Sequence, residues 1–203
     1  MHRLSTSAGN HLLASLPAEA KDELRDKLTP IILENRSQLY WAEQPIEHVY
    51  FVEAGMISIV CTLESGMQAE VGVVGREGVL GASVLSGIGV SFFDAMVQMP
   101  GAALRMSVRD FQRKIETCAP LRQHLLRYKE MLHVQAMQTA ACNGHHRLEQ
   151  RLARWLLVAH DQVDGTELFL TQDFIAMMLG IYRPNVTVIA GNLQRAGLIA
   201  YRS

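Results

Sequence analysis

The chain is poor in residues that could stabilise it through covalent or metal cross-links. Its 203 residues include only three cysteines, Cys61, Cys118 and Cys142, and no two of them have C-x-x-C spacing. Neither a disulfide framework nor a zinc ribbon fits thiols that are so few and so widely separated. The reducing cytoplasm is therefore the expected compartment.

The sequence also lacks a strong net charge and a long uninterrupted apolar run. Its formal charge of −1 excludes a uniformly basic nucleic-acid-binding coat and an acidic tail. The amino-terminal segment lacks the continuous apolar stretch of a signal peptide. The most apolar segment, residues 78–99, contains Asp94 and several glycines. Buried strands and turns fit it better than a membrane-spanning helix, so we expect no membrane partner.

The sequence has the composition of a globular protein, and its two halves have opposite net charges. Apolar residues make up 49% and charged residues 19% of the sequence, and its length allows one or two domains. Up to Met106 there are seven basic and twelve acidic residues, a net charge of −5. From Ser107 onward there are twelve basic and eight acidic residues, a net charge of +4. This division indicates two modules with different partners.

The acidic part is typical of a small β domain. After two short helices predicted over residues 10–16 and 18–27, five segments are rich in β-branched residues and partly alternate in polarity. Glycines and a Pro100-Gly101 pair separate these segments. Strands this short predict a small barrel or sandwich, followed by a helix over residues 107–118. The five predicted strands are residues 49–52, 56–61, 69–74, 95–99 and 102–106.

A long helix is predicted from Pro120 onward. Six of its residues follow a 4-3-4-3-4 spacing, which is the 3.5-residue period of a two-stranded helical seam. We expect this seam to join two copies of the chain, with the polar Gln135 and Thr139 fixing the register. The alternative is a helix that packs on the core of its own domain. The predicted dimer interface consists of Leu121, Leu125, Tyr128, Leu132, Gln135 and Thr139.

The same helix has a second apolar face, so that one face can serve the chain's own β domain and the other a partner helix. This favours a homodimer. A break near Gly144 is predicted to end the helix, and another helix follows over residues 146–160, with Arg147, Arg151 and Arg154 opposite its apolar face. The second apolar set consists of Leu126, Met131, Val134 and Met137.

The most specific local pattern lies near the carboxyl end. Thr171 suits the N-cap of a short helix, Gly180 suits the left-handed residue that ends it, and Pro184 suits the start of a second helix. Gly197 is expected to end the second helix before a strand begins at Leu198. Two short helices joined by a glycine turn predict a helix-turn-helix; a plain helical hairpin is the alternative. The residues expected to face the interior are Ile175, Leu179, Val186, Ile189, Ala190 and Leu193.

The exposed face of the second helix carries side chains that can bind DNA. Arginine pairs with guanine and asparagine with adenine in the major groove, while threonine and valine can contact a thymine methyl group. The amino-terminal residues of such a helix reach base edges, whereas flanking residues position it on phosphates. For Asn192 and Arg195 the alternative is an ordinary solvated surface. The predicted base contacts are Arg183, Asn185, Thr187 and Val188, and the predicted phosphate contacts are Thr171, Gln172, Asn192 and Arg195.

Four further segments and the helix-turn-helix carry a resemblance over nearly the whole chain. They are residues 48–58 (HVYFVEAGMIS), 70–81 (EVGVVGREGVLG), 138–143 (QTAACN) and 151–157 (RLARWLL). In these segments and their order the chain resembles the Crp/Fnr family of bacterial transcription regulators. The resemblance implies an α+β fold with an N-terminal antiparallel β-roll of the cyclic-nucleotide-binding type, a long central dimerisation helix and a C-terminal winged helix-turn-helix. It also implies an effector that changes the relative orientation of the helices.

The sequence departs from the cyclic-nucleotide-binding members of that family. Those members hold the ribose with a Gly-Glu pair and the phosphate with an Arg-Ser or Arg-Thr pair. Here Ala82 follows Gly81, and Phe93-Asp94 stands at the second pair. Arg76 could be a substitute cation, but its turn fits a surface loop equally well. These five residues are the candidate effector pocket. A cyclic phosphate needs a cation and donors, so we expect either no small-molecule effector or an unknown one unlike a nucleotide.

No pattern indicates a cofactor, a metal ion or an enzyme. The family's iron–sulfur sensors use an N-terminal cysteine cluster that this sequence lacks. The histidines lack a spacing for haem or metal ligation, and no His-x-His with a following Glu occurs. No nucleophile–base pair, glycine-rich phosphate loop or pair of carboxylates stands out.

The sequence thus predicts three parts and a function. Residues 1–118 are the β-roll, residues 119–143 the dimerisation helix and residues 144–203 the DNA-binding domain, whose wing is expected to be truncated at Ser203. We expect a cytoplasmic homodimer that binds a two-fold-symmetric site on double-stranded DNA, with recognition helices about 34 Å apart, and that works with RNA polymerase. The alternative is a ligand-binding or protein-interaction module of this fold that has lost DNA binding or binds a cyclic nucleotide atypically.

Overall fold

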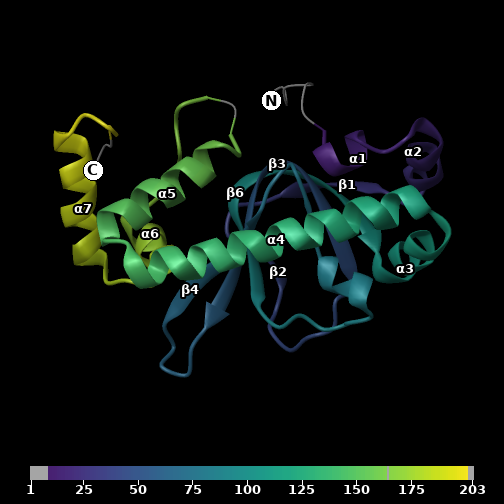
Figure 1. The fold of residues 1–203 in the computed structure, drawn as a ribbon, viewed down its shortest axis with the longest axis horizontal. Coiled ribbons are helices and arrows are strands. Elements are labelled where there is room, and N and C mark those ends of the chain that lie inside the picture. Colours follow the sequence, from purple (N-terminus) through teal and green to yellow (C-terminus); the bar gives the residue numbers. More distant parts are fainter. Residues whose placement is uncertain (1–8, 164, 201–203) are drawn as a thin grey trace.

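The computed structural model describes residues 9–163 and 165–200 and shows a β domain and a helical domain joined by one long helix (Figure 1). The long helix α4 runs across the β domain, and α5, α6 and α7 gather at its carboxyl-terminal end (Figure 1). The chain is therefore α+β, with its parts in the predicted order. The helices are α1 (His11–Ala14), α2 (Ala18–Arg25), α3 (Val108–Thr117), α4 (Ala119–His145), α5 (Leu148–His160), α6 (Gln172–Leu179) and α7 (Arg183–Arg195).

The β domain is a six-stranded sheet with antiparallel pairing throughout. The main path has the order β1-β6-β3-β4, while β2 also pairs with β6 and β5 with β3. This pairing does not close the sheet into a barrel; it forms the open β-roll implied by the resemblance. The elements are β1 (Thr29–Leu33), β2 (Gln38–Tyr40), β3 (His48–Thr62), β4 (Gln68–Val74), β5 (Val79–Leu80) and β6 (Asp94–Ser107), with a 3-10 helix η1 (Ala82–Ser86).

Two pairs of predicted strands are single long strands in the structure. The segments on either side of Gly55 both lie in β3, and those on either side of Pro100-Gly101 both lie in β6. The prediction of turns here is wrong, because Gly55, with φ +83°, lies in a bulge where the register between β3 and β6 shifts. A Cβ on Gly55 would lie 2.5 Å from the Met99 carbonyl oxygen, so these strands need glycine for their close approach. The sequence pattern also missed the shorter strands β1, β2 and β5.

Two hydrophobic clusters stabilise the two ends of the molecule. The first lies between the sheet, α1 to α3 and the first half of α4, where Phe51 and Phe111 are fully buried with ring centroids 6.2 Å apart. The second holds α5, α6 and α7 together and includes Val60 of β3. Burying a large apolar side chain contributes about 1.5–3 kcal/mol. Because Val60 belongs to the second cluster, the helical domain packs directly on the sheet.

The helix α4 packs on its own β domain with the face that the sequence analysis assigned to a dimer. Leu121 and Leu125 are fully buried, Tyr128 is 8% exposed, and Leu132 packs against the same cluster. Leu121, Leu125 and Tyr128 are therefore not available for the predicted dimer interface and pack on the chain's own core, as in the alternative. Leu132 is only half-buried. A helix buries the same stripe of residues whether its neighbour is a sheet or another helix, so periodicity alone does not identify the neighbour.

The second apolar set forms the exposed face of α4. These side chains remain 47% to 61% exposed and lie away from the β domain. The helix also continues to His145, past the break predicted near Gly144. One glycine inside a helix costs only about 1 kcal/mol, which α4 tolerates before His146 takes an extended conformation at φ −89° and ψ 146°. The exposed apolar residues are Leu126, Met131, Val134 and Met137.

Residues 78–99 form strands and a 3-10 helix, as expected, instead of a long apolar helix. Within the described parts of the chain, no single helix has the length and apolar character needed to cross a membrane. The helices α6 and α7 pass that test only when taken together, and they are bent by 105° at the break between them.

Replacing Gly101 with alanine should destabilise the β domain. A Cβ at this position would overlap the Ala54 carbonyl group, so β3 and β6 would have to separate. Over-packing of this kind costs about 1–3 kcal/mol. Urea denaturation followed by circular dichroism measures the free energy of unfolding. The matched control is Gly89→Ala, whose added Cβ would have nothing within 4 Å and which should change that free energy by less than about 0.5 kcal/mol. Equal values for the two variants would contradict this account.

Candidate nucleic-acid interface

The carboxyl-terminal helices form the predicted helix-turn-helix. The 105° bend between α6 and α7 lies in the range typical of this motif. The Thr171 hydroxyl accepts a hydrogen bond from the Phe174 amide at 3.2 Å and so caps α6. Gly180 has φ +62°, and this left-handed residue ends α6. The cap and the glycine turn are confirmed.

The start of α7 differs by one residue from the prediction. Tyr182 is the N-cap, with an extended backbone at ψ 140°, so Arg183 is the first helical residue and Pro184 the second. Proline is compatible with this place because the first-turn amides have no partner within the helix. The packing face is as predicted, whereas Ile175 of α6 is only half-buried. The buried residues of α7 are Val186, Ile189, Ala190 and Leu193.

The strand predicted after α7 does not occur among the described residues. Gly197 has φ +71° and follows the end of the helix, as expected. Leu198, however, lies in a bend and is 70% exposed, and Ile199 has no regular structure. The wing that the sequence analysis expected to be cut short would continue into residues 201–203, which lie outside the described residues.

The predicted base-contacting side chains lie on the exposed amino-terminal part of α7. Arg183, Asn185 and Thr187 are exposed, and Val188 has 62% of its surface accessible. The partial positive charge of a helix amino terminus adds to the attraction for phosphates. Sequence reasoning missed Tyr182, which is 74% exposed beside these residues; as an N-cap outside the helical periodicity, it gives no pattern signal.

Two of the predicted base contacts are paired with α6 in the free protein. The Arg183 Nε atom lies 3.4 Å from Asp173 Oδ1, and the Thr187 hydroxyl donates a hydrogen bond to Gln172 Oε1 at 2.8 Å. These pairs are exposed, and exposed ion pairs contribute only about 0–1 kcal/mol. The helix α6 therefore orients the side chains of α7 while leaving them able to exchange partners for DNA.

The second half of α7 is more constrained. The Asn192 amide donates a hydrogen bond to the Glu149 carboxylate of α5, and its oxygen accepts one from Arg195. Asn192 is half-buried, so its geometry favours a role in packing α7 on α5 over a free phosphate contact. Arg195 and Thr171 are exposed. Their assignment to phosphates stays a prediction.

The five residues of the candidate effector pocket lie in different surroundings. A Cβ on Gly81 would lie 2.6 Å from the Tyr40 hydroxyl, because that side chain fills the adjoining interior. Asp94 accepts hydrogen bonds from the Ala42 amide at 2.9 Å and the Thr62 hydroxyl at 3.2 Å, at the start of β6. Phe93 is 41% exposed. The sequence places these residues near one another along the chain, whereas their side chains enter different environments.

The remaining two residues of that set are Ala82 and Arg76. Ala82 is buried, and the Arg76 amide donates a hydrogen bond to Gln162 Oε1 at 3.3 Å. On the α4 side, a Cβ on Gly78 would overlap the Tyr128 ring, so this tyrosine fills the space between the sheet and the helix. Residues 9–163 and 165–200 contain no group of three His, Cys, Asp or Glu side chains that could hold a metal ion.

Comparison with protein-family models finds two matches in the order seen in the fold. A cyclic nucleotide-binding domain matches residues 31–118, and a Crp-like helix-turn-helix domain matches residues 150–203. Together these matches account for more than half of the chain. The chain belongs to the Crp/Fnr family of transcription regulators. No curated protein sequence matches it significantly.

Solved structures of other bacterial proteins have the same fold. The regulator CLP of Xanthomonas campestris, described as responsive to c-di-GMP, is 16% identical, with a TM-score of 0.73 over 92% of this chain and 96% of that one. FixK2 of Bradyrhizobium japonicum is 16% identical, with a TM-score of 0.74 over 87% and 89% of the two chains. A CRP-family regulator of Thermus thermophilus is 17% identical, with a TM-score of 0.70 over 85% and 88%.

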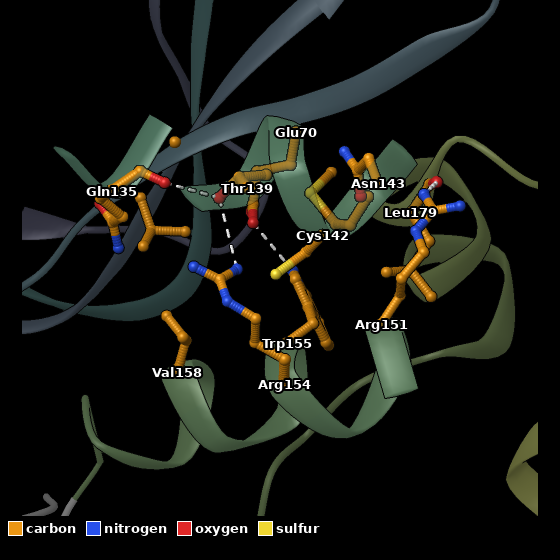
Figure 2. Close-up of a pocket in the computed structure, with 13 residues that line it drawn as sticks. Glu70, Gln135, Thr139, Cys142, Asn143, Arg151, Arg154, Trp155, Val158 and Leu179 are labelled. Carbon is orange, nitrogen blue, oxygen red and sulfur yellow. Dashed lines mark hydrogen bonds between the residues drawn. The ribbon is translucent and has the colours of Figure 1, made fainter. Parts of the chain in front are cut away.

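In this Crp/Fnr protein a cavity lies between the β domain and the helical domain (Figure 2). We call it the interdomain cavity; its volume is about 40 Å³, and β4, α4, α5 and α6 line it. Arg154 donates a hydrogen bond to the Thr139 hydroxyl at 3.3 Å, and Arg151 donates one to the Leu179 carbonyl at 2.6 Å. Both arginines thus face the junction, which the predicted helical wheel did not indicate. Gln135, from the predicted dimer seam, lines the same cavity.

One carboxylate of the β domain reaches across this junction. Glu70 accepts a hydrogen bond from the Trp155 indole at 2.9 Å and one from the Ser58 hydroxyl at 2.6 Å. Loss of hydration raises the pKa of Glu70 to about 7, against the opposing effects of these two bonds and the positive charge of Arg154. Glu70 and Trp155 both lie in segments that carry the family resemblance, but no sequence pattern pairs residues so far apart.

Cyclic AMP should leave the melting temperature of the protein unchanged. Tyr40 and Tyr128 fill the interior beside Gly81 and Gly78, and Asp94 is a carboxylate where a cyclic phosphate would need a cation. A ligand at 100 times its dissociation constant would add about 2.7 kcal/mol of stability. Differential scanning fluorimetry detects such a change readily. A rise in melting temperature with cyclic AMP or cyclic GMP, but not with linear AMP, would overturn this prediction.

Proposed function

We propose that this Crp/Fnr regulator acts as a homodimer whose two α7 helices bind a two-fold-symmetric site on double-stranded DNA. The observation that carries the proposal is the exposure of Arg183, Asn185, Thr187 and Val188 on one end of a capped, well-packed helix. Helices of this motif enter the major groove with their amino-terminal residues at the base edges. RNA polymerase is the expected protein partner, since the family regulates transcription.

The exposed face of α4 supports the homodimer. It is defined by Leu126, Met131, Val134 and Met137, which leave a stripe of apolar surface opposite the residues buried in the β domain. Contiguous apolar surface on a long helix is typical of an interface between protein chains. A second α4 lying along this stripe would bury it and place two helix-turn-helix motifs on one side of the dimer. The proposed interface is thus the second apolar set of α4.

Effector control takes a different form from that of the cyclic-nucleotide-binding members. The interior near Gly78 and Gly81 is occupied by tyrosine side chains, and Asp94 replaces a cation. We therefore propose that the orientation of the helical domain responds to something other than a cyclic nucleotide in the β-roll.

Replacing Arg183 with alanine should weaken binding to the specific site by about 1–3 kcal/mol, because one guanine contact per half-site is lost. Sites would first be selected from a random DNA pool and then titrated in a mobility-shift assay at fixed salt. The control, Gln194→Ala, changes an exposed residue near the other end of α7 and should leave affinity nearly unchanged. A loss that is equal on specific and random DNA would show that Arg183 contacts phosphate only. No retardation of the wild-type dimer at low salt would favour the alternative module without DNA binding.

Replacing Val134 with glutamate should separate the dimer into folded monomers, because a charge would be placed in the apolar stripe. Sedimentation velocity gives the mass of the species, and circular dichroism reports the fold. Ala136→Glu adds the same charge at an exposed position on another side of α4 and should remain dimeric. A monomeric wild type, or equal dissociation of both variants, would be incompatible with the proposed interface.

A further inference from the structure

The helical domain rests on the β domain through a small number of specific contacts. Ala159 of α5 is fully buried with Met56, Val73 and Met99 of the sheet. Next to this apolar contact lies a chain of hydrogen bonds across three strands and α5. Apolar contacts tolerate small rotations, whereas hydrogen bonds require defined distances and angles. The hydrogen bonds therefore restrict the orientation of α5 more narrowly than this apolar contact does.

The chain of hydrogen bonds runs from Gln98 of β6 through Ser58 of β3 and Glu70 of β4 to Trp155 of α5. Gln98 and Ser58 are buried, with 3% and 0% of their surfaces exposed, and Trp155 is 7% exposed. Glu70 is half-buried at the edge of the interdomain cavity. A change at Glu70 thus acts on both domains at once.

This series of hydrogen bonds has two states, which differ by one proton. The Ser58 hydroxyl has one proton but lies within hydrogen-bonding distance of both Glu70 Oε2 and Gln98 Oε1. If Glu70 is ionised, Ser58 donates to it, and the Gln98 amide must turn to donate to Ser58. If Glu70 is protonated, it donates to Ser58, which in turn donates to Gln98. In both states Glu70 Oε1 can accept from Trp155, so the difference lies in the charge.

Few other charged groups face Glu70. From α5, Arg154 attracts the ionised carboxylate, and Arg151 lines the same cavity. From α4, Cys142 is a titratable group on the cavity wall. The cavity lining from α6 consists of Met178 and Leu179, and the neighbours from β3 and β6 are the neutral Ser58 and Gln98. The carboxylate thus has one nearby positive charge and little water.

We propose that Glu70 is a positioning residue that makes the docking of the helical domain on the β domain depend on proton binding: the protonated side chain keeps the domains docked, and loss of its proton to solvent favours an opened junction in which water hydrates the carboxylate. The cavity beside Glu70 is the place where such opening begins. An effect on DNA binding rests on the function proposed above, because α5 carries α6 and α7 with it. The docking step does not depend on that function.

The direction of the effect follows from where the proton binds more tightly. The docked form holds the pKa of Glu70 near 7, and hydration in an opened form returns it toward 4.5. The docked form therefore keeps the proton across this interval, and docking weakens as the pH rises from 4.5 to 7. The equilibrium constant for docking should decrease by about 100-fold over this pH range.

Trp155 provides a direct measurement of docking. The chain has two tryptophans, and Trp41→Phe changes the other one at a position that is 63% exposed. In this single-tryptophan protein, emission wavelength and quenching by iodide would be measured from about pH 4 to about pH 8. The emission should shift to longer wavelength and quenching should rise with a midpoint between pH 4.5 and pH 7, the pKa values of Glu70 in the opened and docked forms. A signal that does not change with pH would overturn the proposal.

Two variants in the same background test whether Glu70 causes the transition. Glu70→Gln keeps the hydrogen-bonding oxygen and all eight histidines but cannot ionise, so the transition should vanish. A transition that persists in this variant would assign it to a histidine and overturn the proposal. Ser58→Ala removes a bond that lowers the pKa of Glu70, so the midpoint should move to higher pH. An unchanged midpoint in a folded Ser58→Ala protein would also contradict the proposal.

DNA binding is measured separately, so that the two proposals fail in distinguishable ways. Wild type and Glu70→Gln would be titrated onto a selected DNA site at about pH 6 and pH 8. The ratio of the two affinities should differ between the proteins if the orientation of α5 sets the position of α7. Equal ratios would overturn the link from docking to DNA. Absence of DNA binding at either pH would refute the proposed function and leave the fluorescence result standing.

Discussion

The burial of one face of α4 on the β domain is the constraint on which the rest of the structure depends. Leu121, Leu125 and Tyr128 fix this helix against the sheet, and a fixed helix has only its opposite side left for a partner. The same contact closes the interior of the β-roll, because the Tyr128 ring occupies the space beside Gly78. The packing of α4 thus determines which face of this helix is left for a partner chain. It also leaves little room for a nucleotide inside the β-roll.

The helical domain is held in a different way. Its own core is apolar, but its contact with the sheet combines a few apolar residues with the Glu70–Trp155 hydrogen bond. A junction of this kind is specific in orientation and modest in strength, since a partly desolvated carboxylate offsets much of what its hydrogen bonds contribute. The change in orientation of the helical domain proposed above requires a junction with this balance.

Local chemistry made the helix-turn-helix predictable. Thr171 caps a helix because its hydroxyl can accept from first-turn amides, and Gly180 ends one because it adopts positive φ without strain. The four buried positions of α7 were predicted from spacing alone. The boundaries at Arg183 and Leu198 were not, because proline is tolerated at more than one place in a first turn and a strand needs a neighbour to pair with.

The sequence by itself determined the fold class, the order of the parts, the family and the exposed residues at the start of α7, because caps, glycine turns and apolar spacing act within a few residues. Only the tertiary structure decided which face of α4 is buried, where Gly55 and Gly101 make a bulge instead of turns, and which charged groups meet at the junction of the two domains. An apolar stripe on a helix is the same for a sheet or a partner helix, and the local sequence carries no record of a contact between Glu70 and Trp155, which are 85 positions apart. Such long-range contacts form only when the whole chain has folded and its interior excludes water.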